Sequence, residues 1–90
     1  MFYVYILKSK KYPNKVYTGF SKNLKQRLID HNKISNKGYT KQFQPWEIVT
    51  YVCFSSEKLA REFEKYLKTG SGIAFMRKRL LEDLTKPKQK

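Results

Sequence analysis

The feature that most constrains this fold is an unbroken run of aromatic and aliphatic residues at positions 2–7. A short run rich in tyrosine, valine and isoleucine is typical of a strand buried on both faces. Side chains alternate along a strand, so the run supplies two apolar faces. One face is expected to carry Tyr3, Tyr5 and Leu7, and the other Phe2, Val4 and Ile6.

A polar, lysine-rich segment separates this run from a second strand predicted at 16–20. Its Pro13 and Asn14 form a turn signal, so the two strands most simply make a hairpin. Gly19 is unusual inside a strand, where glycine often marks a bulge or a close approach to the backbone. A third strand, rich in β-branched and aromatic residues, is predicted at Trp46–Phe54.

A first helix is expected after the second strand, capped by Ser21 or Asn23 and running to about Asn32. At about 100° per residue, one continuous face of this helix carries, in order, Arg27, His31, Leu24 and Leu28. A guanidinium group and the single histidine of the chain therefore share the stripe that is expected to pack on the sheet.

Two further helices are expected after the third strand. The first of them is capped by Ser55 or Ser56 and ended by Gly70. Its apolar stripe is Leu59, Phe63 and Leu67, flanked by Ala60 and Tyr66. The last helix is predicted over 73–84, before Pro87, with core-facing residues Ile73, Met76, Leu80, Leu81 and Leu84.

The order β-β-α-β-α-α predicts an α+β fold, in which helices flank a small three-stranded antiparallel or mixed sheet. A chain of 90 residues has room for one small core. Residues 1–85 are therefore expected to form a single domain, and 86–90 a basic C-terminal tail.

The charge of the chain is strongly asymmetric, with 20 Lys and Arg against 7 Asp and Glu and a net charge of +13. Residues 1–29 contain no acid, yet they carry Lys8, Lys10, Lys11, Lys15, Lys22, Lys25 and Arg27. This pattern indicates a polyanionic partner, most simply nucleic acid. The alternatives are a merely soluble basic protein, or one that binds the ribosome or a membrane surface.

Cysteine and histidine usage excludes two classes of small domain. One cysteine cannot form an intrachain disulfide, and one cysteine with one histidine cannot build a structural zinc site. The apolar neighbours of Cys53 suggest a buried thiol in a reducing compartment. The apolar runs are too short to span a bilayer, and the start shows no signal peptide, so a cytoplasmic location is expected.

Several motifs resemble the GIY-YIG nuclease domain: YVY at 3–5, YTG at 17–19, and a following helix that carries Arg27. FSKNLKQRL at 20–28, GYTK at 38–41, PWEIV at 45–49 and REFEKYLK at 61–68 resemble later segments of its small stand-alone bacterial members. The resemblance covers roughly residues 2–84. It departs from the family pattern at Tyr3, where the first motif has glycine, and at Thr18, where the second has isoleucine.

The resemblance implies a metal-dependent endonuclease that hydrolyses phosphodiester bonds, with DNA favoured over RNA as its partner and no required protein partner. It makes Tyr5 and Tyr17 the motif tyrosines, one of which orients or deprotonates the attacking water. It places Arg27 on the scissile phosphate, His31 in an assisting position and Glu64 on one divalent ion, Mg²⁺ or Mn²⁺. DNA repair is one role that such an enzyme would serve.

The chemistry of these residues is consistent with that reaction. Phosphodiester cleavage needs a nucleophile, charge neutralisation and help for the leaving group. The guanidinium of Arg27 is a forked donor suited to phosphate oxygens. A single carboxylate with waters suits Mg²⁺. Tyr5 and Tyr17, on neighbouring strands, are expected roughly 5–8 Å apart, and Gly19 is expected to leave that face open to a phosphate.

Each of these residues also has a structural interpretation. Tyr5 and Tyr17 could be half-buried strand aromatics, Arg27 a boundary residue that lies over Leu24 and Leu28, and His31 a structural histidine. Glu62 and Glu64 flank the second helix stripe on opposite sides, and periodicity does not choose between them. Further nucleic-acid contacts are predicted for Lys22, Lys25, Tyr39 and Lys41, the last two in a loop.

Two functions of other classes remain open from the sequence. One is a nucleic-acid-binding module of the same fold that has little or no catalytic activity. The other is a protein-interaction adaptor whose basic surface binds an acidic partner.

Overall fold

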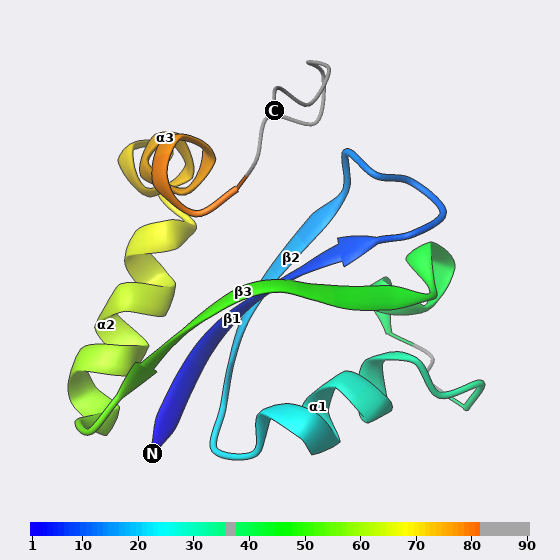
Figure 1. Cartoon of the computed structure of the whole chain (residues 1–90), viewed down its shortest axis with the longest axis horizontal. Helices are drawn as coiled ribbons and strands as arrows, with labels where there is room; N and C mark the ends of the chain where they lie inside the picture. The colour runs from blue at the N-terminus through cyan, green and yellow to red at the C-terminus, as the bar shows by residue number, and fades with distance from the viewer. Residues whose placement is uncertain (36–37, 82–90) are drawn as a thin grey trace, which may run out of the picture.

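The computed structural model describes residues 1–35 and 38–81. Three strands form an antiparallel sheet in the order β2-β1-β3: β1 (Phe2–Ser9), β2 (Val16–Ser21) and β3 (Trp46–Phe54). Helix α1 (Leu24–His31) and a 3-10 helix, η1 (Tyr39–Phe43), follow β2, whereas α2 (Glu57–Leu67) and α3 (Gly70–Arg79) follow β3. The predicted α+β fold and its order of elements are confirmed (Figure 1).

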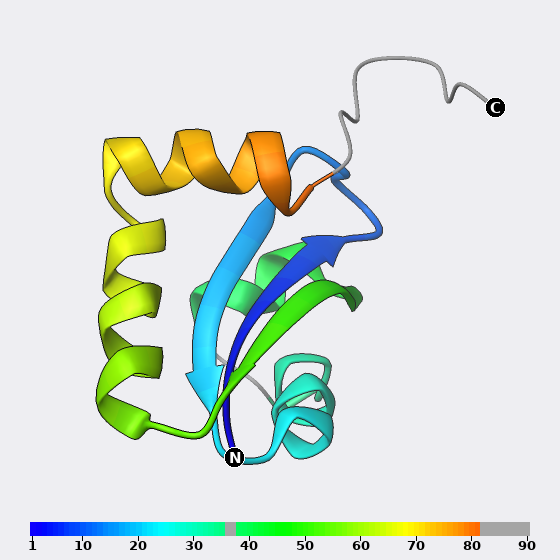
Figure 2. The ribbon, with the colours of Figure 1, turned by 60° about the vertical axis from the view of Figure 1, so that its left-hand side comes forward.

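Strand β1 lies between the other two strands and packs on both faces. Val4 and Ile6 belong to a core cluster with residues of α2 and α3, whereas Tyr5 and Leu7 cluster with Trp46 on the opposite face. Figure 2 shows these layers, with α2 and α3 on one side of the strands and α1 on the other, and Figure 1 shows η1 on the same side as α1. The alternation predicted for residues 2–7 is therefore confirmed.

The hairpin register brings the first two strands together at Gly19. Tyr5 pairs with Gly19, and Leu7 pairs with Tyr17. A Cβ atom at Gly19 would collide with the phenol of Tyr5, so glycine is needed for this close approach. The irregularity of the sheet lies elsewhere, between Ile6 and Leu7 where β1 pairs with β3. Of the two interpretations of Gly19, the close approach is the one observed.

The boundary between the last two helices differs from the prediction. Helix α2 ends at Leu67, and Gly70 opens α3 instead of ending α2. The reason is Thr69, whose hydroxyl oxygen accepts a hydrogen bond from the backbone N–H of Gly72 at 3.1 Å and so caps a new helix. Gly72 permits close packing of the two helices, because a Cβ atom there would collide with the backbone of Tyr66.

Three predictions of burial were wrong. Leu59 is 54% exposed, because α2 turns Ala60 and Leu67 toward the core instead. Ile73 is 41% exposed. Cys53 is exposed, because exposed and half-buried residues alternate along the edge strand β3 and this residue is one of the exposed set. Leu84 and the tail predicted at 86–90 lie outside the described residues. None of the described helices has the length and apolar composition needed to cross a membrane.

Candidate active site

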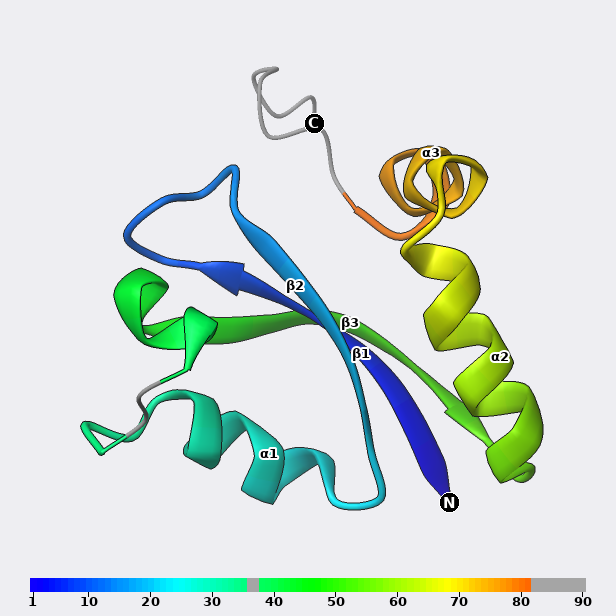
Figure 3. The ribbon, with the colours of Figure 1, turned by 180° about the vertical axis from the view of Figure 1, so that it is seen from behind.

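A groove of about 410 Å³ lies where the edge strand β2 passes between α1 and α2, the arrangement seen from behind in Figure 3. Strands β1 and β2, the turn after β2, and both helices contribute to its lining, which comprises Tyr5, Tyr17, Gly19, Phe20, Lys22, Arg27, Arg61 and Glu64. The fold thus brings together four of the residues predicted to act in catalysis or metal binding. The fifth, His31, hydrogen-bonds to Tyr5.

Tyr5 and His31 form the buried side of this site. The Tyr5 side chain is almost fully buried, and its hydroxyl oxygen lies 2.9 Å from Nε2 of His31. On the other side of the imidazole, Nδ1 lies 3.1 Å from the Thr40 hydroxyl. Thr40 is in turn fixed through its backbone carbonyl, which accepts a hydrogen bond from the indole N–H of Trp46 at 2.8 Å. A continuous hydrogen-bonded chain therefore runs from the groove into the protein.

Burial sets the protonation states of this pair. Burial raises the pKa of the Tyr5 hydroxyl well above its ordinary value of 10.0; the Tyr17 and Glu64 charges add to this effect, and Arg27 opposes it. Burial also lowers the pKa of His31 from 6.5, and the positive charge of Arg27 lowers it further. Near neutral pH the pair is thus a protonated phenol beside a neutral imidazole, which has one donor and one acceptor nitrogen.

Tyr17 packs beside Tyr5 and His31 and completes an aromatic cluster with them. Its ring centroid lies 6.4 Å from that of Tyr5, within the predicted range, and 4.9 Å from that of His31. Gly19, predicted to leave this face open, lines the groove. The Tyr5 phenol occupies the space where a Cβ atom of residue 19 would lie.

The short connection from β2 to α1 positions Arg27. Of the two predicted caps, Asn23 is the one observed, and its side-chain oxygen accepts a hydrogen bond from the backbone N–H of Gln26 at 3.1 Å. Arg27 lies one helical turn before His31, so both side chains face the same part of the sheet. Arg27 is exposed in the groove, whereas His31 is buried beneath it.

The structure separates the two acids that periodicity left equivalent. Glu64 lines the groove with a side chain that is 21% exposed, whereas Glu62 is exposed and not part of the lining. The Nζ of Lys68, which lies one helical turn after Glu64 at the end of α2, is 3.0 Å from Oε2 of Glu64. Within 1–35 and 38–81, no group of three or more His, Cys, Asp or Glu side chains could hold a metal ion. A metal here would therefore take one protein carboxylate, which fits an ion that keeps several waters.

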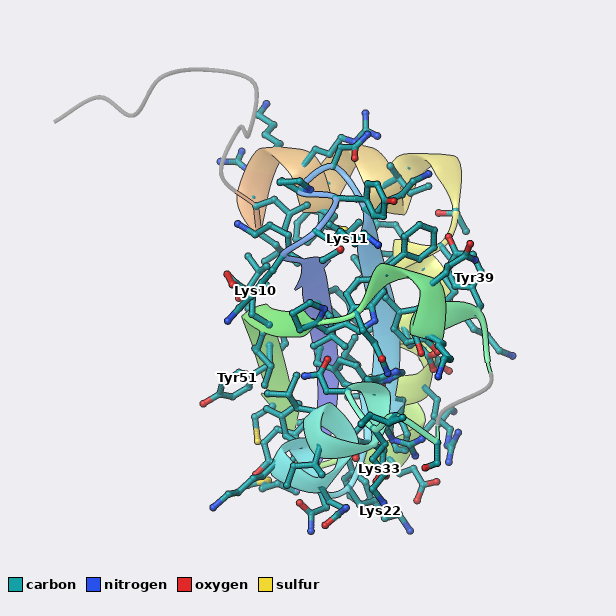
Figure 4. All side chains as sticks on the ribbon, turned by 90° about the vertical axis from the view of Figure 1, so that its right-hand side faces the viewer. Lys10, Lys11, Lys22, Lys33, Tyr39 and Tyr51 are labelled. Carbon is teal, nitrogen blue, oxygen red and sulfur yellow. The ribbon has the colours of Figure 1, made fainter. Side chains whose placement is uncertain are left out.

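The residues predicted to contact nucleic acid fall in different places. Lys22 lines this groove and also a second groove between α1 and β3, whereas Lys25 lines only the second one. Tyr39 and Lys41 lie in η1 instead of the predicted loop, and Lys41 donates a hydrogen bond to the carbonyl oxygen of Ile34. Figure 4 shows Lys22 and Tyr39 well apart on one side of the molecule. Only the first of these four residues joins the candidate active site.

Sequence reasoning missed Arg61, which lines the groove from α2. A signal for it was present, because Arg61 precedes Glu64 by three residues and side chains at that spacing share a helix face. Arg61 and Glu64 both line the groove from α2.

A sequence model described as the GIY-YIG catalytic domain matches residues 1–74. The chain belongs to the GIY-YIG family. The matched span contains every residue that lines the groove, together with His31 and Thr40. GIY-YIG domains are a family of nucleases, so membership implies a nucleic acid substrate.

Several small bacterial proteins are similar to this chain in sequence. UPF0213 protein SSP2268 of Staphylococcus saprophyticus is 39% identical over 64 residues, which cover 69% of this chain and 76% of that protein. UPF0213 protein CPE1444 of Clostridium perfringens is 37% identical over 68 residues, covering 76% of this chain and 71% of the relative. The solution NMR structure of the UPF0213 protein BH0048 from Bacillus halodurans is similar with a TM-score of 0.50 and 26% identity, over 84% of this chain and 82% of that one.

Proposed function

We propose that this protein is a metal-dependent endonuclease that hydrolyses phosphodiester bonds in DNA. The observation that carries the proposal is the convergence of Tyr5, Tyr17, Arg27 and Glu64 on one groove. These side chains come from four elements, and each matches a need of phosphodiester hydrolysis: a base for water, a donor for the phosphate and a ligand for a cation.

Tyr5 and His31 are suited to take the proton of the attacking water. The raised pKa of Tyr5 makes its phenolate unfavourable, so the hydroxyl needs an acceptor for its own proton. His31 provides this acceptor at Nε2 if Nδ1 carries the ring proton and donates it to the Thr40 hydroxyl oxygen. As the water oxygen bonds to phosphorus and the bond from phosphorus to the leaving ester oxygen breaks, the water proton passes to Tyr5 while the Tyr5 proton moves to His31. The leaving oxygen takes its proton from solvent. Tyr17, beside both rings, orients the water.

Arg27 is placed to bind the scissile phosphate. Its guanidinium lies in the groove close enough to affect the pKa values of both Tyr5 and His31. A forked donor can hold two phosphate oxygens at once, which fixes the phosphorus atom relative to the Tyr5 hydroxyl. The same charge stabilises the additional negative charge that develops on the phosphate during attack.

Glu64 is the residue that would hold one Mg²⁺ or Mn²⁺, because a half-buried carboxylate is a hard oxygen ligand. Such an ion, when bound, supplies charge neutralisation on the phosphate and on the leaving oxygen. Lys68 fixes the carboxylate by pairing with Oε2, so that its orientation toward the groove is set before a ligand arrives.

One observation favours a second function, which is nucleic acid binding with little or no cleavage. The Lys68 ammonium at 3.0 Å already neutralises Glu64, and a divalent ion has to compete with this pair. In that case the groove would still bind a phosphate through Arg27 and Lys22, but without hydrolysis.

A cleavage assay distinguishes these two functions. Purified protein is incubated with labelled duplex, single-stranded, flap and branched DNA, and with RNA, in Mg²⁺, Mn²⁺ or EDTA. The proposal predicts DNA cleavage that requires the divalent ion and that Arg27→Ala abolishes, while Lys25→Ala, a matched cation on the same helix outside the groove, retains activity. Binding without cleavage under every condition would support the second function, and cleavage equal in Arg27→Ala and wild type would contradict the proposed site.

A further inference from the structure

The rim of the groove carries a charge arrangement that the proposed hydrolysis does not use. Glu57, in the first turn of α2, contacts two cations from different elements. The Nε of Arg61 lies 2.9 Å from Oε2 of Glu57, and Nζ of Lys22 lies 3.8 Å from Oε1. Both Lys22 and Arg61 line the same groove as Arg27 and Glu64.

Two aromatic rings lie beneath these cations. The guanidinium carbon of Arg61 lies 4.1 Å from the ring centroid of Phe20, and Nζ of Lys22 lies 5.8 Å from that of Phe2. The two rings stack on one another with centroids 6.3 Å apart. Stacking uses the flat face of a guanidinium and leaves its N–H edge available to donate hydrogen bonds. The Arg61 side chain is therefore held in place while its donors remain usable.

The charges of this rim match a single additional anion. Glu57 is ionised, since the hydrogen bond from Arg61 holds the pKa of its carboxyl below the ordinary value. Two cations and one carboxylate leave one net positive charge, which balances the single negative charge of one phosphodiester group. All three side chains are at least 40% exposed, so a ligand can reach them.

An ordinary surface ion pair does not explain the whole arrangement. Arg61 and Glu57 have the i, i+4 spacing common on exposed helices, where such pairs contribute little. Lys22, however, comes from the turn before α1 and joins the same carboxylate from across the edge of β2. Convergence of two elements at the mouth of a groove is what a binding site for an extended polyanion requires.

We propose that Arg61 and Lys22 form a second phosphate subsite, which binds the phosphodiester group next to the one that is cut. This inference rests on the proposed function, because it assumes a nucleic acid strand in the groove. The Arg61 fork donates to two oxygens of that phosphate, and Lys22 adds a point charge. Glu57 holds the two cations close together in the free protein, and the phosphate oxygens replace its carboxylate on binding.

The subsite makes affinity depend on the number of phosphates. Binding is measured in EDTA, so that cleavage plays no part, by NMR titration with the dinucleotide TpT, which has one phosphodiester, and with TpTpT, which has two. The wild type is expected to bind TpTpT about 5- to 10-fold more tightly than TpT, a size appropriate to one charge-assisted phosphate contact. Arg61→Gln is expected to remove most of this difference while leaving TpT binding within twofold.

Lys65→Gln is the matched control, since Lys65 is an exposed cation on the same helix that is not part of the lining. It is expected to keep the wild-type ratio between the two ligands. Equal losses in Arg61→Gln and Lys65→Gln would show a general charge effect and overturn the subsite. With longer duplex DNA, Arg61→Gln is expected to reduce the slope of log affinity against log salt by about 0.9, the value of one lost phosphate contact.

The variants also separate this inference from the proposed function. Failure of wild-type protein to bind either ligand or duplex DNA would contradict the proposed function itself. Binding that is insensitive to Arg61→Gln, together with loss of binding in Arg27→Ala, would retain the function and overturn only the second subsite. If Arg61→Gln folds poorly, Arg61→Lys is the second variant. It keeps the charge but loses the forked guanidinium, so its ratio of TpTpT to TpT affinity is expected to lie between those of the wild type and Arg61→Gln. An unchanged ratio would overturn the assignment of the guanidinium fork.

Discussion

The hydroxyl oxygen of Tyr5 lies 2.9 Å from Nε2 of His31, a buried contact between residues 26 positions apart. It joins the central strand to the C-terminal end of α1 directly beneath the groove. Because Thr40 lies on the other side of the imidazole, both ring nitrogens of His31 have a hydrogen-bond partner. The proposed chemistry depends on this relationship, and it leads to the first expected outcome.

Tyr5→Phe is expected to lower the cleavage rate by about 10²- to 10⁴-fold, the usual size of a general acid–base contribution. The phenylalanine keeps the ring beside Gly19 but removes the hydroxyl that hydrogen-bonds to His31. A stability cost of about 1 kcal/mol is expected from the lost buried hydrogen bond. Single-turnover rates and urea unfolding measure the two effects separately. A Tyr5→Phe rate within threefold of the wild type would exclude the proposed proton transfer.

The pKa of His31 can be read without ambiguity, because the chain has a single histidine. Its pKa is expected below 6.5, since burial and the charge of Arg27 both favour the neutral ring. The cleavage rate is expected to fall as the pH drops through this pKa, because Nε2 becomes protonated and can no longer accept the Tyr5 proton. The pKa of His31 is higher in the unfolded chain, so below about pH 6.5 the unfolded chain binds more protons than the folded protein. The free energy of unfolding is therefore expected to decrease as the pH drops through this range.

An NMR titration of the imidazole resonances provides the measurement. Arg27→Ala is expected to raise the pKa of His31, whereas Lys25→Ala, a cation on the same helix that lines a different groove, is expected to change it less. A pKa at or above 6.5 in the wild type would contradict the buried, neutral imidazole.

Gly19→Ala is expected to destabilise the protein by about 1–3 kcal/mol, the usual cost of forcing an extra methyl group into a packed site. The added Cβ would collide with the Tyr5 phenol, so the ring has to move away from His31, and activity is expected to fall as well. Gly70→Ala is the control, because nothing lies within 4 Å of a Cβ at that position. Thermal unfolding compares them, and equal midpoints for the two variants would show that the Tyr5–Gly19 contact is not needed.

Strong local patterns made most of the fold predictable. The strand at Trp46–Phe54 has the predicted bounds, because β-branched and aromatic residues fill it between a proline and two serines. The break between α2 and α3 was predicted but misplaced: Gly70 opens α3 instead of ending α2, because a glycine after an apolar stripe resembles a helix end. Whether Gly70 ends one helix or opens the next depends on the cap that Thr69 provides for α3.

The candidate site was predictable where sequence neighbours share a face. Arg27 and His31 are one turn apart on α1, and their joint position followed from periodicity. The choice of Glu64 over Glu62 depended on the family resemblance, since only the packing of α2 against the edge of the sheet shows which side of the helix meets the groove. The contact of Glu57 with Lys22 joins distant parts of the chain, so no local pattern indicated it, whereas Glu57 and Arg61 have the i, i+4 spacing of neighbours on one helix.

The measurement that tests the account most directly is cleavage of labelled DNA in Mg²⁺ by Glu64→Gln and Glu62→Gln, two variants with the same change of charge on one helix. Glu64→Gln is expected to lose at least about 10²-fold in rate, because several kcal/mol of transition-state stabilisation depend on the cation it holds. Glu62→Gln is expected to cleave within twofold of the wild type, since it does not line the groove. Equal activity in the two variants, or equal loss, would contradict the placement of the active site at the edge of β2.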